Sequence, residues 1–268
     1  MQVWTVANQK GGVGKTTTSV SLAGLLSQRG KKVLMIDMDP HGSMTTYFGL
    51  DPDNVEGGVY TLFTTLGGNS MPEKKILIRN TAFADLDLMP ASAALATLDR
   101  QLGARPGMGL ILKTALDKLS HEYEYVIIDC PPSLGILMIN ALVACEKLLI
   151  PVQTEFLAIK GLERILHTID MIMHSLSSPL EYIIIPTMFD KRTRASHEAL
   201  DMLQQKYEYN LWGNVVPVDT QFRDASLKGQ PISYMKPNSR GTVAYKMLLE
   251  SLFAHGHEHT GKVVGVFP

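Results

Sequence analysis

The stretch of this chain that most constrains its fold is Lys10–Thr17, which reads KGGVGKTT. An apolar run, Val3–Ala7, precedes it, and a segment of helical period, Lys15–Gln28, follows it. Glycines let successive backbone N–H groups turn inward around an anion, and the positive end of the following helix strengthens that binding. The pattern therefore predicts a phosphate-binding loop between a buried strand and a helix, rather than a glycine-rich turn that only links the two.

This loop predicts a site for ATP and Mg²⁺. It has the spacing of a P-loop, with Gly14-Lys15-Thr16 at its end. Lys15 is expected to contact the β- and γ-phosphates, and the Thr16 hydroxyl is expected to ligate Mg²⁺. The expected nucleotide contacts of the loop are Gly11, Gly12, Val13, Gly14, Lys15, Thr16 and Thr17.

Carboxylates follow two further apolar runs and suit the same site. The run Tyr125–Asp129 ends in an aspartate, and the run Lys32–Ile36 is followed by Asp37 and Asp39. The carboxyl ends of parallel strands lie beside the phosphate loop in this architecture, where carboxylates can hold the shell of Mg²⁺. We expect Asp37 and Asp129 to support the metal and Asp39 to orient or activate the attacking water. The alternative for each aspartate is a turn cap.

The rest of the chain alternates short apolar runs with helical patterns, which predicts parallel strands covered on both faces. The expected strands are Val3–Ala7, Lys32–Ile36, Leu86–Met89, Tyr125–Asp129, Lys147–Val152, Tyr182–Pro186 and Asn214–Val216. The expected helices are Lys15–Gln28, Gly109–Leu119, Leu137–Ala144, Ala158–Ser175, Ala195–Lys206 and Gly241–Phe253. The fold class is therefore a single-domain α/β P-loop NTPase, with a mostly parallel twisted sheet and helices on both faces.

Length and composition indicate how many domains the chain forms and which cellular compartment it fits. The chain has 268 residues and a formal net charge of −1, so nucleic-acid binding would need a local basic patch. Two cysteines without metal-ligand spacing argue against a disulfide framework and fit a cytoplasmic protein. No apolar run is long enough to span a membrane. We expect one ATPase domain over 1–254 and a C-terminal tail over 255–268. Loops and one short helix are expected within Gly49–Thr81.

In the order of its motifs the chain resembles the ParA/MinD family of deviant Walker-A ATPases. The matching segments are KGGVGKTT at Lys10–Thr17, DMDPHGSMT at Asp37–Thr45, VIIDCPPSLG at Val126–Gly135, PVQTEFLAIKGL at Pro151–Leu162, TMFDKRT at Thr187–Thr193 and GQPISYMKPNSRGTVAY at Gly229–Tyr245. They cover nearly the whole length. The resemblance implies ATP hydrolysis in an ATP sandwich dimer, with Lys10 reaching the partner's phosphates as an arginine finger does. It also implies that Pro217, Val218 and Asp219 border the adenine.

Details of the resemblance favour the ParA branch. The tail His255–Pro268 has one lysine and no amphipathic period, whereas MinD proteins end in a basic amphipathic membrane helix. His41 stands where segregation ParA proteins usually carry glutamine, which resembles the ParC type associated with polar chemotaxis arrays. The implied partners are a second copy of the chain and a ParB-like or chemotaxis-array adaptor, with no membrane. The implied locations are the cytoplasm, the nucleoid or the cell pole. A metabolic P-loop kinase or ligase and a MinD-like positioning ATPase are the alternatives.

Members of the family also bind DNA without sequence preference in the ATP dimer. Residues 186–246 contain nine cationic and six anionic side chains, so the excess is modest. One family arginine aligns with Gln221, while Arg223 lies two places further on. A solvated basic face without DNA binding is the other interpretation. The expected DNA contacts are Arg192, Arg194, Arg223 and Lys228.

Overall fold

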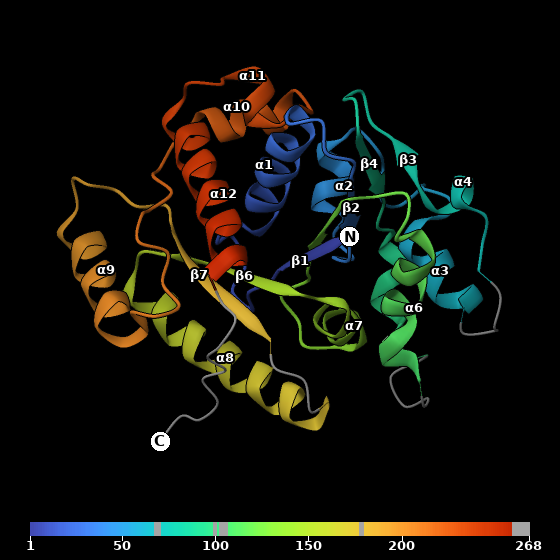
Figure 1. The fold of residues 1–268 in the computed structure, drawn as a ribbon, viewed down its shortest axis with the longest axis horizontal. Coiled ribbons are helices and arrows are strands. Elements are labelled where there is room, and N and C mark those ends of the chain that lie inside the picture. Colours follow the sequence, from blue (N-terminus) through green and yellow to red (C-terminus); the bar gives the residue numbers. More distant parts are fainter. Residues whose placement is uncertain (67–70, 99–100, 102–106, 177–179, 259–268) are drawn as a thin grey trace.

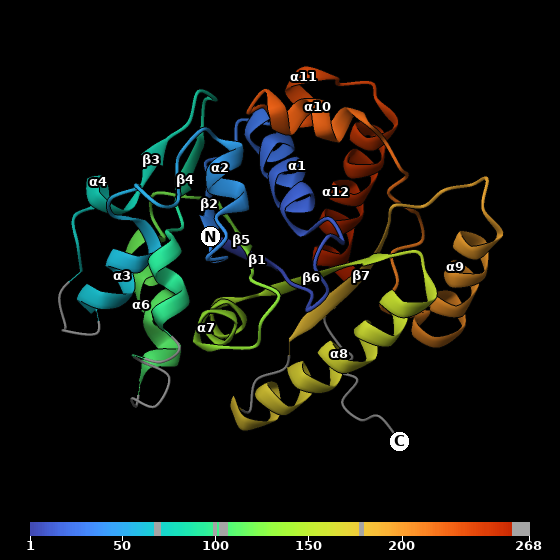
Figure 2. The same ribbon diagram turned by 180° about the vertical axis from the view of Figure 1, so that it is seen from behind.

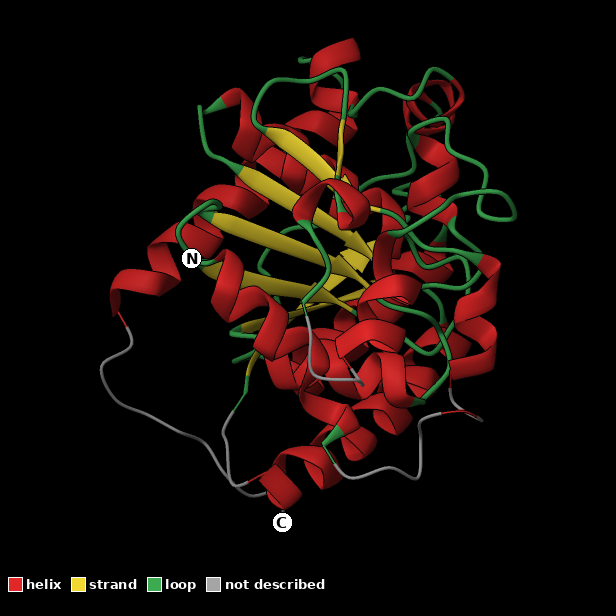
Figure 3. Ribbon diagram, turned by 90° about the vertical axis from the view of Figure 1, so that its right-hand side faces the viewer, coloured by secondary structure: helices red, strands yellow, loops and turns green. Residues whose placement is uncertain are grey.

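A seven-stranded sheet forms the centre of the protein, seen in a computed structural model that describes residues 1–66, 71–98, 101, 107–176 and 180–258. The strand order is β3-β4-β2-β5-β1-β6-β7, and every pair is parallel except the antiparallel β3–β4 pair at one edge. Helices lie on both sides of the sheet (Figure 3). The strands are β1 (Gln2–Val6), β2 (Val33–Asp37), β3 (Arg79–Asn80), β4 (Leu86–Met89), β5 (Tyr125–Asp129), β6 (Lys147–Gln153) and β7 (Glu181–Thr187).

One face of the sheet packs against α1 and α12, and the opposite face packs against α3, α6, α7, α8 and α9 (Figures 1 and 2). Alternate strand residues serve the two faces: Ile127 joins the α1 side, while Val126 and Ile128 join the other. This arrangement explains why the strands read as continuous apolar runs. The helices are α1 (Lys15–Gln28), α2 (Ser43–Tyr47), α3 (Gly58–Leu66), α4 (Lys74–Leu77), α6 (Ile111–Leu119), α7 (Ile136–Ala144), α8 (Phe156–Leu176), α9 (Arg194–Tyr207), α10 (Gln221–Leu227), α11 (Ile232–Met235) and α12 (Arg240–Glu258), with short 3₁₀ turns at Ala93–Thr97 and Met108–Leu110.

The predicted α/β P-loop fold is confirmed, and α1, β4 and β5 have the predicted bounds. The predicted strand Asn214–Val216 is wrong. This segment runs beside the end of β7 with only isolated bridges, between Ile184 and Leu211 and between Phe189 and Pro217. The N–H groups of Val216 and Val218 donate to the carbonyls of Pro186 and Phe189, at 2.8 Å and 3.1 Å, so the segment is attached to β7 and its continuation without forming a strand of the sheet.

The segment Gly49–Thr81 is more ordered than predicted, with α3, α4 and β3 in place of one short helix. Residues Val59, Leu62 and Phe63 are buried at helical spacing in α3. Two glycines with positive φ, Gly57 and Gly58, open this helix and obscure its periodicity in the sequence. A Cβ on Gly58 would lie 2.2 Å from the carbonyl oxygen of Pro90, so the close approach requires glycine.

Helix α12 continues to Glu258, four residues past the predicted end of the ATPase domain at 254. Residues 259–268 lie outside the described residues, so the division into a domain at 1–254 and a tail at 255–268 stays a prediction. Among the helices that the structure describes, none is both long and apolar enough to cross a membrane.

Candidate nucleotide-binding site

The predicted phosphate loop connects β1 to α1 and leaves the start of α1 without a side-chain cap. Gly12 has φ +75° and Gly14 has φ +92°, conformations that glycine adopts without the penalty a Cβ carries. The first N–H groups of a helix have no partner within the helix. With Gly14 at the N-cap and no capping side chain, these N–H groups are available to bind an anion.

Side chains on both sides of the loop hold it in place. Asn8 is fully buried; its Nδ2 donates to the carbonyl of Pro151 at 2.8 Å, and its Oδ1 accepts from the Lys10 N–H at 2.9 Å. Asn8 thus ties the loop to β6. Lys15 is 8% exposed, and its Nζ lies 3.4 Å from the carbonyl oxygen of Lys10. The ammonium group is therefore folded over the loop that it is predicted to serve.

The three predicted metal-binding residues come together at the carboxyl ends of β2 and β5. Asp37 and Asp129 are opposite residues in the register of these strands. The Thr16 hydroxyl donates to Asp129 Oδ2 at 2.6 Å, and Ser19, which sequence reasoning missed, donates to Oδ1 at 3.3 Å. Hydroxyl and carboxylate oxygens are the ligands that Mg²⁺ prefers, so the residues present fit this ion.

Asp37 is held by the start of α2. Its Oδ2 accepts hydrogen bonds from the Thr45 N–H at 2.8 Å and the Thr45 hydroxyl at 2.7 Å. Burial raises the pKa of Asp37, although these hydrogen bonds oppose that rise. Burial, followed by the charge of Asp37, raises the pKa of Asp129. Two buried carboxylates side by side are unfavourable when both are ionised, and a divalent cation would relieve that repulsion.

Replacing Asp129 by asparagine is expected to stabilise the nucleotide-free protein in EDTA. A carboxyl whose pKa is raised by folding contributes stability at low pH and loses it as pH rises through the folded-state pKa. The gain from Asp129→Asn should therefore be larger at pH 8.5 than at pH 6. At the higher pH we expect about 2 kcal/mol, or roughly 5 °C in Tm, measured by differential scanning calorimetry. A gain that is equal at both pH values would contradict this electrostatic account. Asp87→Asn, which changes a carboxylate on β4, is the control.

Asp39 follows β2 and faces partly outward, with 13% of its side chain exposed. Its Oδ1 accepts from the His41 N–H at 3.0 Å and contacts His41 Nδ1 at 2.8 Å. Its N–H donates to Asp37 Oδ1 at 3.2 Å, which fixes it beside the predicted metal ligands. Its Oδ2 accepts no hydrogen bond from any residue that the structure describes, so this oxygen can contact a water.

Lys10 forms an ion pair with Glu155, immediately before α8, within the same chain. Its side chain is 30% exposed and that of Glu155 is 40% exposed, so solvent weakens the pair. A reach into a partner subunit would require Lys10 to leave Glu155. The predicted role of Lys10 in a dimer stays a prediction.

The predicted base loop is anchored to the segment that follows β7. The N–H of Val218 donates to the carbonyl of Phe189 at 3.1 Å. The Asp219 carboxylate is occupied inside the protein: it accepts from the N–H of Gln221 at 3.0 Å and the N–H of Gly241 at 2.9 Å. Asp219 therefore joins the starts of α10 and α12, while Val218 is 46% exposed. Adenine contact by Pro217, Val218 and Asp219 stays a prediction.

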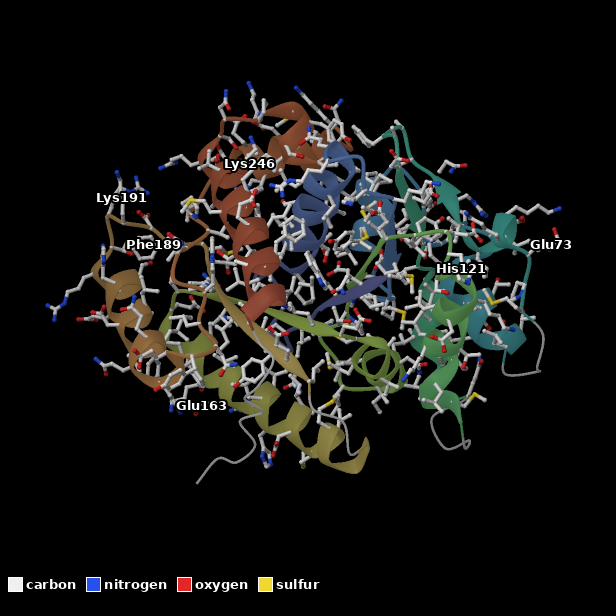
Figure 4. All side chains as sticks on the ribbon, viewed as in Figure 1. Glu73, His121, Glu163, Phe189, Lys191 and Lys246 are labelled. Carbon is white, nitrogen blue, oxygen red and sulfur yellow. The ribbon has the colours of Figure 1, made fainter. Side chains whose placement is uncertain are left out.

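The four predicted DNA contacts lie on two separate helices, α9 and α10, or next to an end of one of them. Arg192 and Arg194 are 80% and 91% exposed, and they pair with Asp190 and Glu198 respectively. Lys191 lies beside them near the tip of the loop between β7 and α9, pointing away from the sheet (Figure 4). Arg223 on α10 and Lys228, directly after that helix, are also exposed. The surface is basic but its arginines are partly neutralised by neighbouring carboxylates.

Comparisons with known proteins identify the family to which the chain is similar. The family model described as an AAA domain, AAA_31, matches residues 1–182. The sporulation initiation inhibitor protein Soj of Bacillus subtilis is 36% identical over 253 residues, which cover 94% of this chain and 98% of Soj. The chromosome partitioning protein ParA of Myxococcus xanthus is 35% identical, with 91% of this chain and 84% of that protein covered.

A solved structure carries the same fold with ligands bound. The crystal structure of cobyrinic acid a,c-diamide synthase from Mycobacterium smegmatis with bound ADP and magnesium is 34% identical. It has a TM-score of 0.81, and the comparison covers 96% of each chain. Fold, motif order and relatives agree, and we conclude that the chain belongs to the ParA/MinD family of P-loop ATPases.

Proposed function

We propose that the protein is a ParA-type ATPase that hydrolyses Mg-ATP and uses its nucleotide state to switch between a monomer and an ATP sandwich dimer. The observation that carries this proposal is the cluster at the end of the phosphate loop, where Thr16 donates to Asp129 and Asp129 lies opposite Asp37. The cluster would supply oxygen ligands for Mg²⁺ at the start of α1. Asp39 would position the attacking water and Lys15 would neutralise the phosphates.

Exposed apolar side chains around this site support a dimer. Leu134 follows β5, and Phe156 and Leu157 begin α8 directly after Glu155. They are 48%, 57% and 70% exposed. All three follow the carboxyl ends of strands, at the edge of the sheet that carries the phosphate loop. A second copy related by twofold symmetry would cover them and bring its Lys10 to the phosphates.

The proposed role of the dimer is to position or segregate a cargo in the cytoplasm, on the nucleoid or at the cell pole. The proposed cargo is chromosome or plasmid DNA, and the similarity to the chromosome partitioning protein ParA supports the chromosome. His41 supports a ParC-type role with a polar chemotaxis complex. The proposed stimulating partner is correspondingly a ParB-like protein or a chemotaxis-array adaptor.

Nonspecific DNA binding in the ATP state is proposed to use Arg192 and Arg194. Replacing both by glutamine should flatten the salt dependence of binding, by roughly one unit of slope in log K against log salt for each phosphate that the variant no longer neutralises. The dimer presents the surface twice, so the affinity should fall further with ATP than with ADP. Fluorescence anisotropy with a labelled 40-base-pair duplex measures both effects.

The control for this charge removal is the pair Lys113→Gln and Lys118→Gln on α6, which lies far from α9 (Figure 1). This variant removes the same two positive charges and should keep the affinity and the salt slope of the parent protein. An equal fall in affinity in both double variants would mean that net charge, rather than this surface, sets the binding.

A second candidate is an ATP-dependent ligase, because one structure similar to this chain is named a cobyrinic acid a,c-diamide synthase. Measuring phosphate release separates the two. A ParA-type ATPase turns over Mg-ATP slowly without any acceptor and accelerates when DNA or its partner is added. A ligase releases phosphate only with its acid and amide-donor substrates. Turnover that depends strictly on such substrates would overturn our proposal.

A further inference from the structure

Thr187 is the last residue of β7, and it contacts the phosphate loop from the far side of β6. It is 2% exposed, and it lies opposite Gln153 in the register of β6 and β7. Its hydroxyl donates a hydrogen bond to the carbonyl oxygen of Val13 at 2.9 Å. Val13 is itself fully buried, so this hydroxyl satisfies a carbonyl in the middle of the loop.

Holding the carbonyl of Val13 also fixes the next amide. The peptide bond between Val13 and Gly14 is planar and trans, since the structure describes no cis peptide bond. In a trans peptide the C=O and the following N–H point in opposite directions. With the carbonyl drawn toward Thr187, the N–H of Gly14 points away from β7. Gly14, with φ +92°, has no Cβ that would restrict rotation of this peptide. The orientation of the peptide therefore depends on a contact from outside the loop.

The segment after Thr187 is tied to its surroundings. The N–H of Thr154 donates to the Thr187 carbonyl at 3.0 Å. The Thr154 hydroxyl lies 3.3 Å from the Ser196 hydroxyl in α9, and Phe189 holds the base loop through the N–H of Val218. Thr187 therefore reaches the loop from a rigid support, not from a flexible connection.

We propose that Thr187 is a positioning residue of the nucleotide site, which orients the Val13–Gly14 peptide so that its N–H faces the phosphates. This inference rests on the proposed nucleotide-binding function. The glycine-rich loop cannot fix the orientation of its own peptides. A side chain distant in the sequence therefore supplies part of the preorganisation of the phosphate site. Thr187 touches neither nucleotide nor metal, and its effect passes through the loop.

The test compares three variants for binding of N-methylanthraniloyl-ADP with Mg²⁺, followed by fluorescence titration. Thr187→Val keeps the shape of the side chain and removes the donor, and we expect about a tenfold weaker Kd. Thr187→Ser keeps the hydroxyl and should restore most of the affinity. Thr5→Val is the matched control: it removes a buried hydroxyl that donates to the carbonyl of Ala141 at 3.1 Å and has no hydrogen bond to the loop or to Thr187, and it should keep the parental Kd.

Thermal melting of the nucleotide-free variants accompanies these titrations. A purely structural role for Thr187 would lower Tm in both valine variants and leave their Kd values alike. The inference is overturned if Thr187→Val binds as tightly as the parent protein, if Thr5→Val loses as much affinity, or if serine fails to rescue. Absence of binding by the parent protein would instead refute the proposed nucleotide function.

Discussion

Replacing Lys15 by alanine is expected to weaken binding of both ATP and ADP by at least about 100-fold, the loss that follows when charge-assisted hydrogen bonds to phosphates are removed. Lys15 is buried to 8% exposure and its ammonium lies on the loop at the carbonyl of Lys10. Nucleotide binding would transfer it from that carbonyl to the phosphates. Isothermal titration calorimetry with Mg-ATP and Mg-ADP measures the effect.

The matched control for this variant is Lys75→Ala, on the surface helix α4. Lys75 is 81% exposed and pairs with Glu73, so its replacement removes the same charge far from the loop. The control should bind nucleotide as the parent protein does. If Lys15→Ala retains affinity within threefold of that control, Lys10–Thr17 is not the phosphate loop.

Replacing Asp39 by alanine is expected to lower the rate of ATP hydrolysis by about 10²–10³-fold, within the range lost when a general base or water-positioning group is removed. ATP binding should change little, because Asp39 contacts neither the loop nor Asp129 in the described structure. Its Oδ1 is taken by His41, which leaves Oδ2 to contact the attacking water. The variant should therefore accumulate as the ATP complex.

Single-turnover measurement of phosphate release distinguishes this effect from slow product release. Asp53→Ala, an exposed aspartate of the loop after α2, is the control and should hydrolyse ATP normally. Unchanged hydrolysis in Asp39→Ala would exclude Asp39 from the chemistry. A parallel loss of ATP affinity would instead assign it to binding.

The sequence predicts those parts of the fold in which local pattern and tertiary environment agree. The runs Leu86–Met89 and Tyr125–Asp129 are buried on both faces, so their composition alone marks them as strands. Helix α1 begins where the loop glycines end. The segment Asn214–Val216 has the same apolar character but lies at the edge beside β7, and its pairing depends on partners that the sequence does not specify.

In the site, too, some residues can be predicted from local sequence pattern and others cannot. The sequence brings Thr16, Asp37 and Asp129 together because parallel strands end at one edge of the sheet. It misses the residues that hold them: Asn8, which joins the loop to the carbonyl of Pro151, and Thr187, which is 174 positions from Val13. Such contacts carry no local signal, since a buried threonine at the end of a strand usually reflects β propensity.

Two charged residues, Lys10 and Asp219, illustrate a third case, in which residue identity suggests one role and the structure adds another. Lys10 is predicted to act in a partner subunit, and within one chain it pairs with Glu155. Asp219 is predicted to border the adenine, and its carboxylate links the starts of α10 and α12. Both observations are compatible with the predicted functions, and both add an intrachain contact that pattern alone does not reveal.

The central claim is that bound ATP joins two copies of the chain through Lys10. Multi-angle light scattering after size exclusion, with Mg²⁺ and either ADP or adenylyl-imidodiphosphate, tests it most directly. We expect the parent protein and Asp39→Ala to have the mass of a dimer with the triphosphate and of a monomer with ADP, and Lys10→Ala to remain a monomer in both. A parent protein whose mass is the same with both nucleotides, when both are bound, would contradict the account.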